Sequence, residues 1–261
     1  MCTLSFLPDG NGFVAAMNRD ELRTRPAALP PAVHQAGECT LVYPQESSGG
    51  TWIGGNACGT VLALLNWYSI ERGLLGKKSR SRGELIPQLL KECDTERVKR
   101  AVASLELGGI FPFRLFGFFP QEKTIQEWQW DTGILTSQFH KWGRGHWFSS
   151  SRSDERAAAE RGRACELAWP EQREDPSGWL RRLHAGHLPE PGAFSVCVHR
   201  EDAATVSYTE IEWGSCKLRM RYLAGNPCRA AESQEVSRHL VHSTASQGRF
   251  MPAPNETFLI R

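Results

Sequence analysis

Residues 1–21 read MCTLSFLPDGNGFVAAMNRDE. Two runs of β-compatible residues, 2–7 and 13–17, flank a dense turn signal at 9–12. This pattern predicts a β-hairpin. Antiparallel pairing around such a turn matches residues whose numbers sum to about 21, so we expect the polar residues 18–20 to lie level with Cys2.

Cys2 has the most unusual chemistry of these residues. Met1 is expected to be removed because the side chain that follows it is small, and Cys2 would then carry both a thiol and the free α-amine. An α-amine has a pKa of about 7.7 to 8.0 and can act as a base near neutral pH, beside its own nucleophile. The alternative is that Cys2 is only a small apolar residue near a chain end.

Composition limits the classes of function. The chain has 261 residues, a hydrophobic fraction of 40% and a formal net charge of +2, and it has no long block of one charge. These values are typical of a globular protein and do not favour a nucleic-acid partner. No apolar stretch approaches the about 18 residues that span a bilayer, and no secretion signal is evident, so we expect a cytoplasmic protein. The short basic run at Lys77, Lys78, Arg80 and Arg82 is interpreted as a solvated loop, with contact to an anionic ligand as the less favoured alternative.

Cysteine and histidine spacing does not predict a disulfide or a metal site. The eight cysteines include no C-x-x-C pair and accompany no secretion signal, so reduced thiols are expected. The pairs His184 with His187 and His239 with His242 have no nearby Cys or acidic partner at the spacing of a zinc site. We therefore expect no structural metal and no cofactor.

The rest of the chain alternates strands and helices without a repeat or a linker. A Pro-rich extended loop is expected at Pro26–Pro31, and a buried strand at 60–66 ends in Asn66. Helices are expected from Ser81, from Thr95 and over 153–168 and 177–188, and further strands over 113–119, 124–130, 134–141, 194–199, 205–213 and 216–223. The order indicates one α+β domain, 1–261, in which helices cover largely antiparallel sheets.

A cysteine nucleophile needs a base, a group that orients the base, and a donor to the oxyanion. The α-amine of Cys2 is the candidate base, and Asp20 can hold it across the hairpin. Arg19 can hold Asp20 or counter a thiolate. Asn66, at a strand end, is the candidate oxyanion donor, although a strand-capping role explains it equally well.

Five more residues are candidates for substrate binding. Trp52 and Trp67 flank the expected site and can line an apolar pocket, and Asn18 belongs to the polar cluster. Ser150 can bind a ligand at a strand-to-helix junction, although a helix cap is the simpler explanation. Arg200 follows a predicted strand, where a solvated turn is equally consistent.

Several spaced motifs together resemble one family. They are Met1-Cys2-Thr3, NRDE at 18–21, GGTWIG at 49–54, LLN at 64–66 and RGEL at 82–85. In this order they are similar to the NRDE-motif family, also called the transport and Golgi organisation 2 family. Many members carry Gly-Leu-Ser-Asn where this chain has Phe-Ser-Ser-Ser at 148–151, so an oxyanion role for that Asn has no counterpart here.

That family in turn resembles the N-terminal-nucleophile hydrolases of the choloylglycine hydrolase and penicillin V acylase type. The resemblance implies a four-layer αββα sandwich and an acyl-thioester on the cysteine. It implies catalytic roles for Cys2, Arg19, Asp20 and Asn66, although Arg and Asp are adjacent here and are not in the hydrolases.

Two hypotheses about function follow. The first is a cytoplasmic hydrolase of amide C–N bonds that cleaves a small acylated amide through Cys2. The second is a non-catalytic carrier of an apolar ligand such as haem or an acyl lipid, because the family resemblance links relatives to haem trafficking, Golgi organisation and lipid metabolism.

Overall fold

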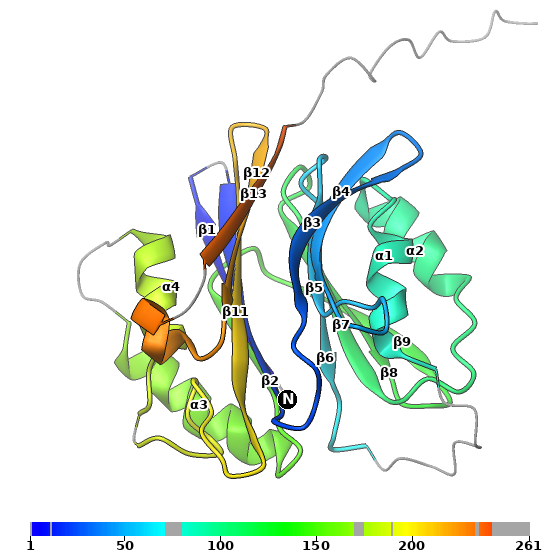
Figure 1. Ribbon diagram of the computed structural model, residues 1–261. Coiled ribbons are helices and arrows are strands. Elements are labelled where there is room, and N and C mark those ends of the chain that lie inside the picture. Colours follow the sequence, from blue (N-terminus) through cyan, green and yellow to red (C-terminus); the bar gives the residue numbers. More distant parts are fainter. Residues whose placement is uncertain are drawn as a thin grey trace, which may run out of the picture.

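The computed structural model describes residues 2–10, 12–70, 80–169, 175–188, 190–232 and 235–241. Met1, Lys77, Lys78 and His242, which carry expectations above, lie outside these residues. Two antiparallel sheets face each other, with α3 (Asp154–Leu167) and α4 (Pro176–His184) outside one sheet and α1 (Leu85–Leu89) and α2 (Thr95–Ala103) outside the other (Figure 1). This arrangement confirms the predicted αββα sandwich.

The first sheet contains the amino-terminal hairpin. Its strand order is β10-β1-β2-β11-β12-β13, and every neighbouring pair is antiparallel. Cys2 pairs with Arg19 across the hairpin, which confirms the register predicted from the turn. The strands are β1 (Cys2–Asp9), β2 (Gly12–Leu22), β10 (Gly145–Ser149), β11 (Ala203–Gly214), β12 (Lys217–Ala224) and β13 (Glu235–Val241).

The second sheet is a meander in chain order, from β3 to β9. Residues 29–31, predicted as part of a Pro-rich loop, instead begin β3, an edge strand. The register with β4 shifts between Leu29 and Ala32, and this irregularity accommodates two prolines that cannot donate to a neighbouring strand. The strands are β3 (Leu29–Ala36), β4 (Cys39–Gln45), β5 (Ile53–Asn56), β6 (Val61–Asn66), β7 (Phe113–Phe119), β8 (Thr124–Trp130) and β9 (Leu135–His140).

The segment before β11 is not the regular strand that alternation predicted. Of residues 194–199, only His199 forms a bridge, with Ala204. The Ser195 hydroxyl lies within hydrogen-bond distance of the backbone oxygens of Gly192 and Cys197, and these local contacts replace a β-ladder. The helix predicted at 177–188 also ends earlier, at His184. The described residues further include the 3-10 turns η1 (Arg82–Glu84) and η2 (Pro227–Glu232).

Three apolar clusters fill the spaces between the four layers. The central cluster lies between the sheets and includes Cys2, Leu4 and Phe6 of β1. Because side chains alternate along a strand, Leu7 points the other way and packs beneath α3 and α4. The β1–β2 hairpin is therefore buried on both faces, which explains its nearly continuous apolar sequence.

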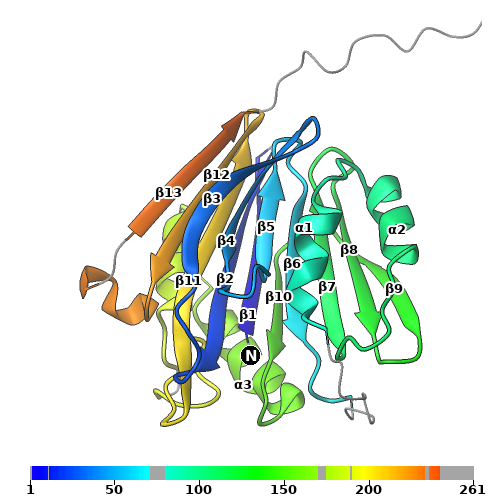
Figure 2. The ribbon, with the colours of Figure 1, turned by 45° about the vertical axis from the view of Figure 1, so that its right-hand side comes forward.

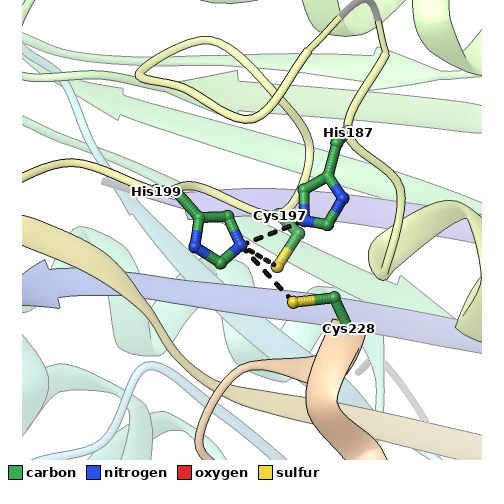
Figure 3. A group of neighbouring side chains, drawn as sticks. All are labelled: His187, Cys197, His199 and Cys228. Atoms are coloured by element: carbon green, nitrogen blue, oxygen red, sulfur yellow. Dashed lines mark hydrogen bonds between the residues drawn. The ribbon is translucent and has the colours of Figure 1, made fainter.

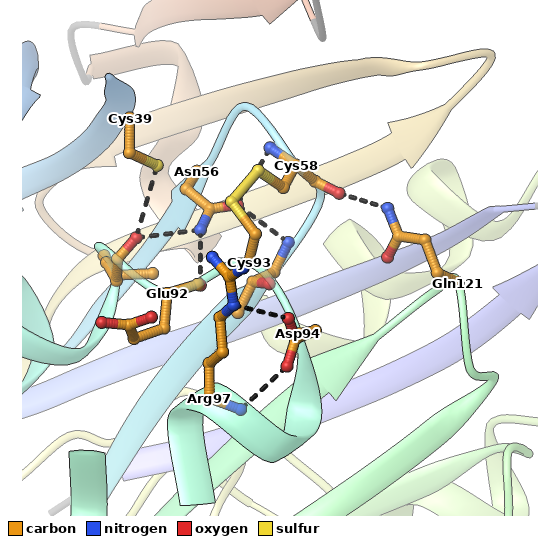
Figure 4. Close-up of a disulfide and its surroundings, with 10 residues drawn as sticks. Cys39, Asn56, Cys58, Glu92, Cys93, Asp94, Arg97 and Gln121 are labelled. Atoms are coloured by element: carbon orange, nitrogen blue, oxygen red, sulfur yellow. Dashed lines mark hydrogen bonds and ion pairs between the residues drawn. A yellow bond between two sulfur atoms is a disulfide. The ribbon is translucent and has the colours of Figure 1, made fainter. Parts of the chain in front are cut away.

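Cys58 and Cys93 form a disulfide, so the prediction of reduced thiols was wrong for this pair (Figure 4). The Asn56 side chain brings the two segments together. Its Nδ2 donates to the carbonyl oxygens of Leu90 (2.8 Å) and Glu92 (3.0 Å), and its Oδ1 accepts from the N–H of Cys58 (3.0 Å). Contact between segments so far apart in sequence could not be predicted from cysteine spacing.

Within the described residues, no helix combines the length and the hydropathy that crossing a membrane requires.

Candidate functional site

A cavity of about 540 Å³ lies where the amino-terminal end of β1 meets the second sheet. Cys2, Arg19 and Asp20 line it from the hairpin, and Trp52 and Asn66 line it from the second sheet. The amino-terminal end of β1 also lies close to α3 (Figure 2). All four residues predicted to be catalytic therefore line one cavity.

The Cys2 thiol is buried at the head of β1, between Ser149 of β10 and Arg19 of β2. Burial raises the pKa of this thiol, and the Asp20 carboxylate adds to the rise. The positive amino terminus, the backbone N–H of Asp20 and the Arg19 guanidinium oppose it. The thiol therefore needs a base to remove its proton before it can act as a nucleophile.

The Asp20 side chain is fully buried, and Arg19, which was predicted to hold it, is not among its partners. Its Oδ1 accepts a hydrogen bond from the Thr205 hydroxyl (2.6 Å), and its Oδ2 lies 3.4 Å from Nη1 of Arg161. Burial raises the pKa of this carboxyl, whereas Arg161 lowers it. The expectation that Arg19 holds Asp20 was wrong, because adjacent residues of a strand point to opposite faces.

Arg161 of α3 is the functional candidate that sequence reasoning missed. Its side chain is fully buried, and its Nη1 donates to the Cys2 carbonyl oxygen (3.2 Å) and to the Thr3 hydroxyl (2.9 Å). The same guanidinium pairs with Asp20, so it connects the backbone of the nucleophile to the carboxylate. The buried face of α3 gave a usable signal, since its other members are the small residues Ala157, Ala164 and Cys165, which leave room for one long side chain.

Arg19 extends into the cavity toward the second sheet. Its guanidinium pairs with Glu46 (2.6 Å) and Glu21 (3.3 Å) and lies 4.7 Å from the centre of the Trp52 ring. These contacts hold a positive charge on the same face of the hairpin as the Cys2 thiol. Of the two roles predicted for Arg19, only the countering of a thiolate fits this geometry.

Asn66 lies at the end of β6, as predicted. Its Nδ2 donates to the Tyr68 hydroxyl (2.7 Å), and both side chains line the Cys2 cavity. The backbone N–H of Tyr68 donates to Asp154 Oδ2 (2.6 Å), which ties this segment to the start of α3. Trp67 instead lines a separate cavity of about 350 Å³ with Asp154, because it points to the opposite side of the chain from Asn66.

Three other predicted binding residues do not line the Cys2 cavity, so we no longer place them in a substrate site there. Asn18 points toward the helices and donates to the carbonyl oxygens of His184 and Val196. The Ser150 hydroxyl accepts a hydrogen bond from the backbone N–H of Arg152 (3.3 Å), and the cap of α3 is Ser153, so the helix-cap explanation was wrong for Ser150. Arg200 pairs with Asp202 and lines a different cavity, of about 700 Å³.

The remaining charged residues of the Cys2 cavity were not expected there. Arg80 and Arg82, interpreted from sequence as part of a solvated loop, line it together with Arg25. Arg82 donates to the Pro112 carbonyl oxygen (3.0 Å), and Arg80 to that of Glu106 (2.9 Å). The described residues that line the cavity thus include four arginines and three acidic residues: Arg19, Arg25, Arg80, Arg82, Asp20, Glu21 and Glu46. The Asp20 carboxylate itself is enclosed by Thr205 and Arg161.

Comparison with known proteins agrees with the motifs and the fold. Residues 1–158 match the family model described as Transport and Golgi organisation 2. No curated protein matches the chain.

Two solved structures are similar. One is a penicillin V acylase from Agrobacterium tumefaciens, with 11% identity, a TM-score of 0.53, and coverage of 84% of this chain and 82% of that one. The other is the C2A mutant of a conjugated bile acid hydrolase from Clostridium perfringens, with 11% identity, a TM-score of 0.46, and coverage of 86% and 89%. The likeness to the penicillin V acylase confirms the predicted fold, and at this identity it is a likeness of fold alone.

Proposed function

Because this chain belongs to the Transport and Golgi organisation 2 family and has the fold of an N-terminal-nucleophile hydrolase, we propose that it is a cysteine amidohydrolase acting on a small acylated amide. The observation that carries this proposal is the convergence of Cys2, Arg19, Asp20 and Asn66 on one cavity. Three strands from two sheets contribute these residues, so their meeting does not follow from sequence neighbourhood.

In this proposal, removal of Met1 gives Cys2 a free α-amine that accepts the thiol proton. The thiolate attacks the amide carbonyl carbon, and the carbonyl oxygen becomes an oxyanion. Collapse of this intermediate breaks the C–N bond, and the protonated α-amine passes its proton to the leaving amine. Water then attacks the thioester, releasing the acid and restoring the thiol, with the α-amine again moving the proton.

Each neighbouring side chain has a separate task in that sequence. Asp20, held by Thr205 and Arg161, accepts a hydrogen bond from the α-ammonium and fixes its position. Burial raises the pKa of the Cys2 thiol, and the Arg19 guanidinium opposes this rise and so stabilises the thiolate. Asn66 has two amide protons, and one is directed to the Tyr68 hydroxyl, so the other is the proposed donor to the oxyanion.

The cavity favours a small polar substrate. Its volume of about 540 Å³ falls within the roughly 300–1,000 Å³ of small-molecule sites. Its four arginines and the carboxylates of Glu21 and Glu46 suit an amide that carries charged or strongly polar groups. These charged side chains do not favour the competing hypothesis of a carrier for haem or an acyl lipid. An apolar ligand would displace water from them without offering hydrogen bonds or an opposite charge in return, which costs free energy. We further propose that the protein acts in the cytoplasm.

The first test is the intact mass of the native protein. The proposal requires loss of Met1, and a retained Met1 would remove the base and refute the mechanism. The second test is incubation with a thiol-reactive acylating probe, followed by peptide mapping.

Cys2 should be labelled ahead of Cys216, which is exposed and serves as the control for simple accessibility. A Cys2→Ala variant should keep the labelling of Cys216 and lose the fast reaction. Labelling of Cys2 no faster than that of Cys216 would count against a nucleophile at this position.

A further inference from the structure

A second cluster of reactive side chains lies beside α4, outside the cavity of Cys2 (Figure 3). It consists of His187, Cys197, His199 and Cys228. His187 follows the end of α4, Cys197 and His199 are on the segment that enters β11, and Cys228 belongs to η2. Three separate parts of the chain thus bring two imidazoles and two thiols together.

The three distances from His199 Nε2 to the other potential ligand atoms are close to those of a tetrahedral metal site. His187 Nε2 lies 3.0 Å from His199 Nε2, and the Sγ atoms of Cys228 and Cys197 lie 3.4 Å and 3.6 Å from that same nitrogen. All four potential ligand atoms are within 4.8 Å of one another. Ideal zinc bond lengths give edges of about 3.3 Å between two nitrogens, about 3.5 Å between nitrogen and sulfur, and about 3.8 Å between two sulfurs.

Hydrogen bonds among the four side chains do not account for this geometry. His199 Nε2 carries either one proton or one lone pair, so it can form one good hydrogen bond, yet three neighbours lie around it. A cation at the centre of the cluster satisfies all four atoms at once, because each directs one lone pair toward it.

We propose that His187, Cys197, His199 and Cys228 form a zinc site of the Cys2His2 type. Two thiolates and two imidazoles are preferred ligands of Zn²⁺, whereas the absence of carboxylates in this set of four disfavours Mg²⁺ and Ca²⁺. Both thiols release their protons to water on binding, and two thiolates neutralise the charge of the ion. Four protein ligands leave no position for water, so the site is structural and not catalytic.

The expectation that no metal is present came from the missing C-x-x-C pair and from the His184–His187 and His239–His242 pairs, which lack a nearby Cys or acidic partner in the sequence. In the fold, the missing ligands come from the next segment of the chain and from η2, at spacings outside the ranges typical of zinc motifs. Cys197 and His199, two residues apart on this segment, both place a potential ligand atom in the cluster.

The zinc site has a direct connection to the site of Cys2. Val198, between two of the ligands, donates its backbone N–H to the Thr205 hydroxyl (2.8 Å), which donates to Asp20 (2.6 Å). The same irregular segment provides the carbonyl oxygens that accept hydrogen bonds from Asn18 (at Val196) and Arg161 (at Ala193). An ion that fixes this segment therefore also fixes Thr205 and Arg161, which contact the Asp20 carboxylate.

The test is the metal content of the full-length protein, purified without a polyhistidine tag and in the presence of a thiol reductant. Elemental analysis should give about one zinc per chain, and the apoprotein should take up Co²⁺ with the visible absorption of a tetrahedral thiolate–imidazole site. His187→Asn and Cys228→Ser should each lose most of the zinc. Cys228→His replaces one zinc ligand with another and should retain the zinc. This variant distinguishes loss of a ligand from misfolding caused by substitution at position 228.

Two controls identify the site. Cys216→Ser removes an exposed thiol outside the cluster, and Cys58→Ser/Cys93→Ser removes two of the three cysteines in the other described group, which also contains Cys39, so both variants should keep the zinc. Three results would overturn the proposal: a native protein without zinc whose reduced form binds no Co²⁺, zinc that persists in His187→Asn and Cys228→Ser, or a Cys197–Cys228 disulfide found after rapid alkylation of the native protein.

Discussion

Replacing Arg161 with methionine should destabilise the protein far more than any other change of a single charge on α3. The guanidinium is fully buried, lies 3.4 Å from Asp20 Oδ2, and donates to the Cys2 carbonyl oxygen, the Thr3 hydroxyl and the Ala193 carbonyl oxygen. Methionine fills part of the space but leaves the carboxylate without a counter-charge and three acceptors without a donor.

The size of the effect follows from those contacts. Removing one partner of a buried ion pair costs about 3–5 kcal/mol, because the other charge stays buried and uncompensated. We therefore expect Arg161→Met to lower the free energy of unfolding by about 4 kcal/mol, a large part of the 5–15 kcal/mol typical of native proteins. Adding Asp20→Asn removes the carboxylate charge that Arg161→Met leaves buried without a partner. The double variant Asp20→Asn/Arg161→Met should therefore be more stable than Arg161→Met by about 2 kcal/mol.

The measurement is urea unfolding followed by tryptophan fluorescence. The matched control is Arg163→Met on the same helix, an exposed position where the change should stay within about 0.5 kcal/mol. If Arg161→Met is too unstable to purify, Arg161→Lys keeps the charge and should show a smaller loss. A loss in Arg161→Met no greater than in Arg163→Met, or a double variant no more stable than Arg161→Met, would refute the assigned role of this ion pair.

Three further predictions concern other parts of the molecule. Burial lowers the pKa of His184 to about 3 and, with the nearby Arg144, that of His146 to about 4, and both rings contact one serine hydroxyl. Below about pH 6.5 the unfolded chain binds a proton at His184 that the folded chain does not, so this residue alone should lower the free energy of unfolding by roughly 3 kcal/mol between pH 6.5 and 4, and His184→Gln should reduce the pH dependence by about that amount in urea titrations. Cys58→Ser/Cys93→Ser should lower the free energy of unfolding by about 4 kcal/mol, since the bridge joins residues 35 apart; a change below 1 kcal/mol would argue against the bridge in solution. Asn66→Ala should slow acyl transfer from a thiol-reactive ester to the nucleophile by about 100-fold with little change in stability, and an unchanged rate would exclude the oxyanion role.

Local pattern was sufficient for the hairpin and for most of the other elements. The strand period of two and the position of the turn fixed the pairing of Cys2 with Arg19. The polar residue after an apolar run placed Asn66 at a strand end beside the same cavity. The same periodicity could have excluded Trp67 from that cavity, because neighbouring residues of an extended chain point in opposite directions.

Side-chain partners that come from distant parts of the chain could not be found in this way. Asp20 is paired with Arg161 of α3 and not with its neighbour Arg19, and Arg19 is paired with Glu46 of the opposite sheet. These pairs depend on how the hairpin packs between α3 and the second sheet. Nothing in the local sequence around Asp20 contains that information.

By itself, the sequence determined that Cys2 lies at the head of a strand level with Arg19 and Asp20, because turn position and side-chain alternation are local properties of the backbone. The tertiary structure decided what surrounds Cys2: the Arg161 beneath it, the charged lining of its cavity, and the cluster of His187, Cys197, His199 and Cys228 that we assign to zinc. These groups meet because layers of the sandwich pack on one another, and packing brings together residues whose separation along the chain no periodic pattern encodes.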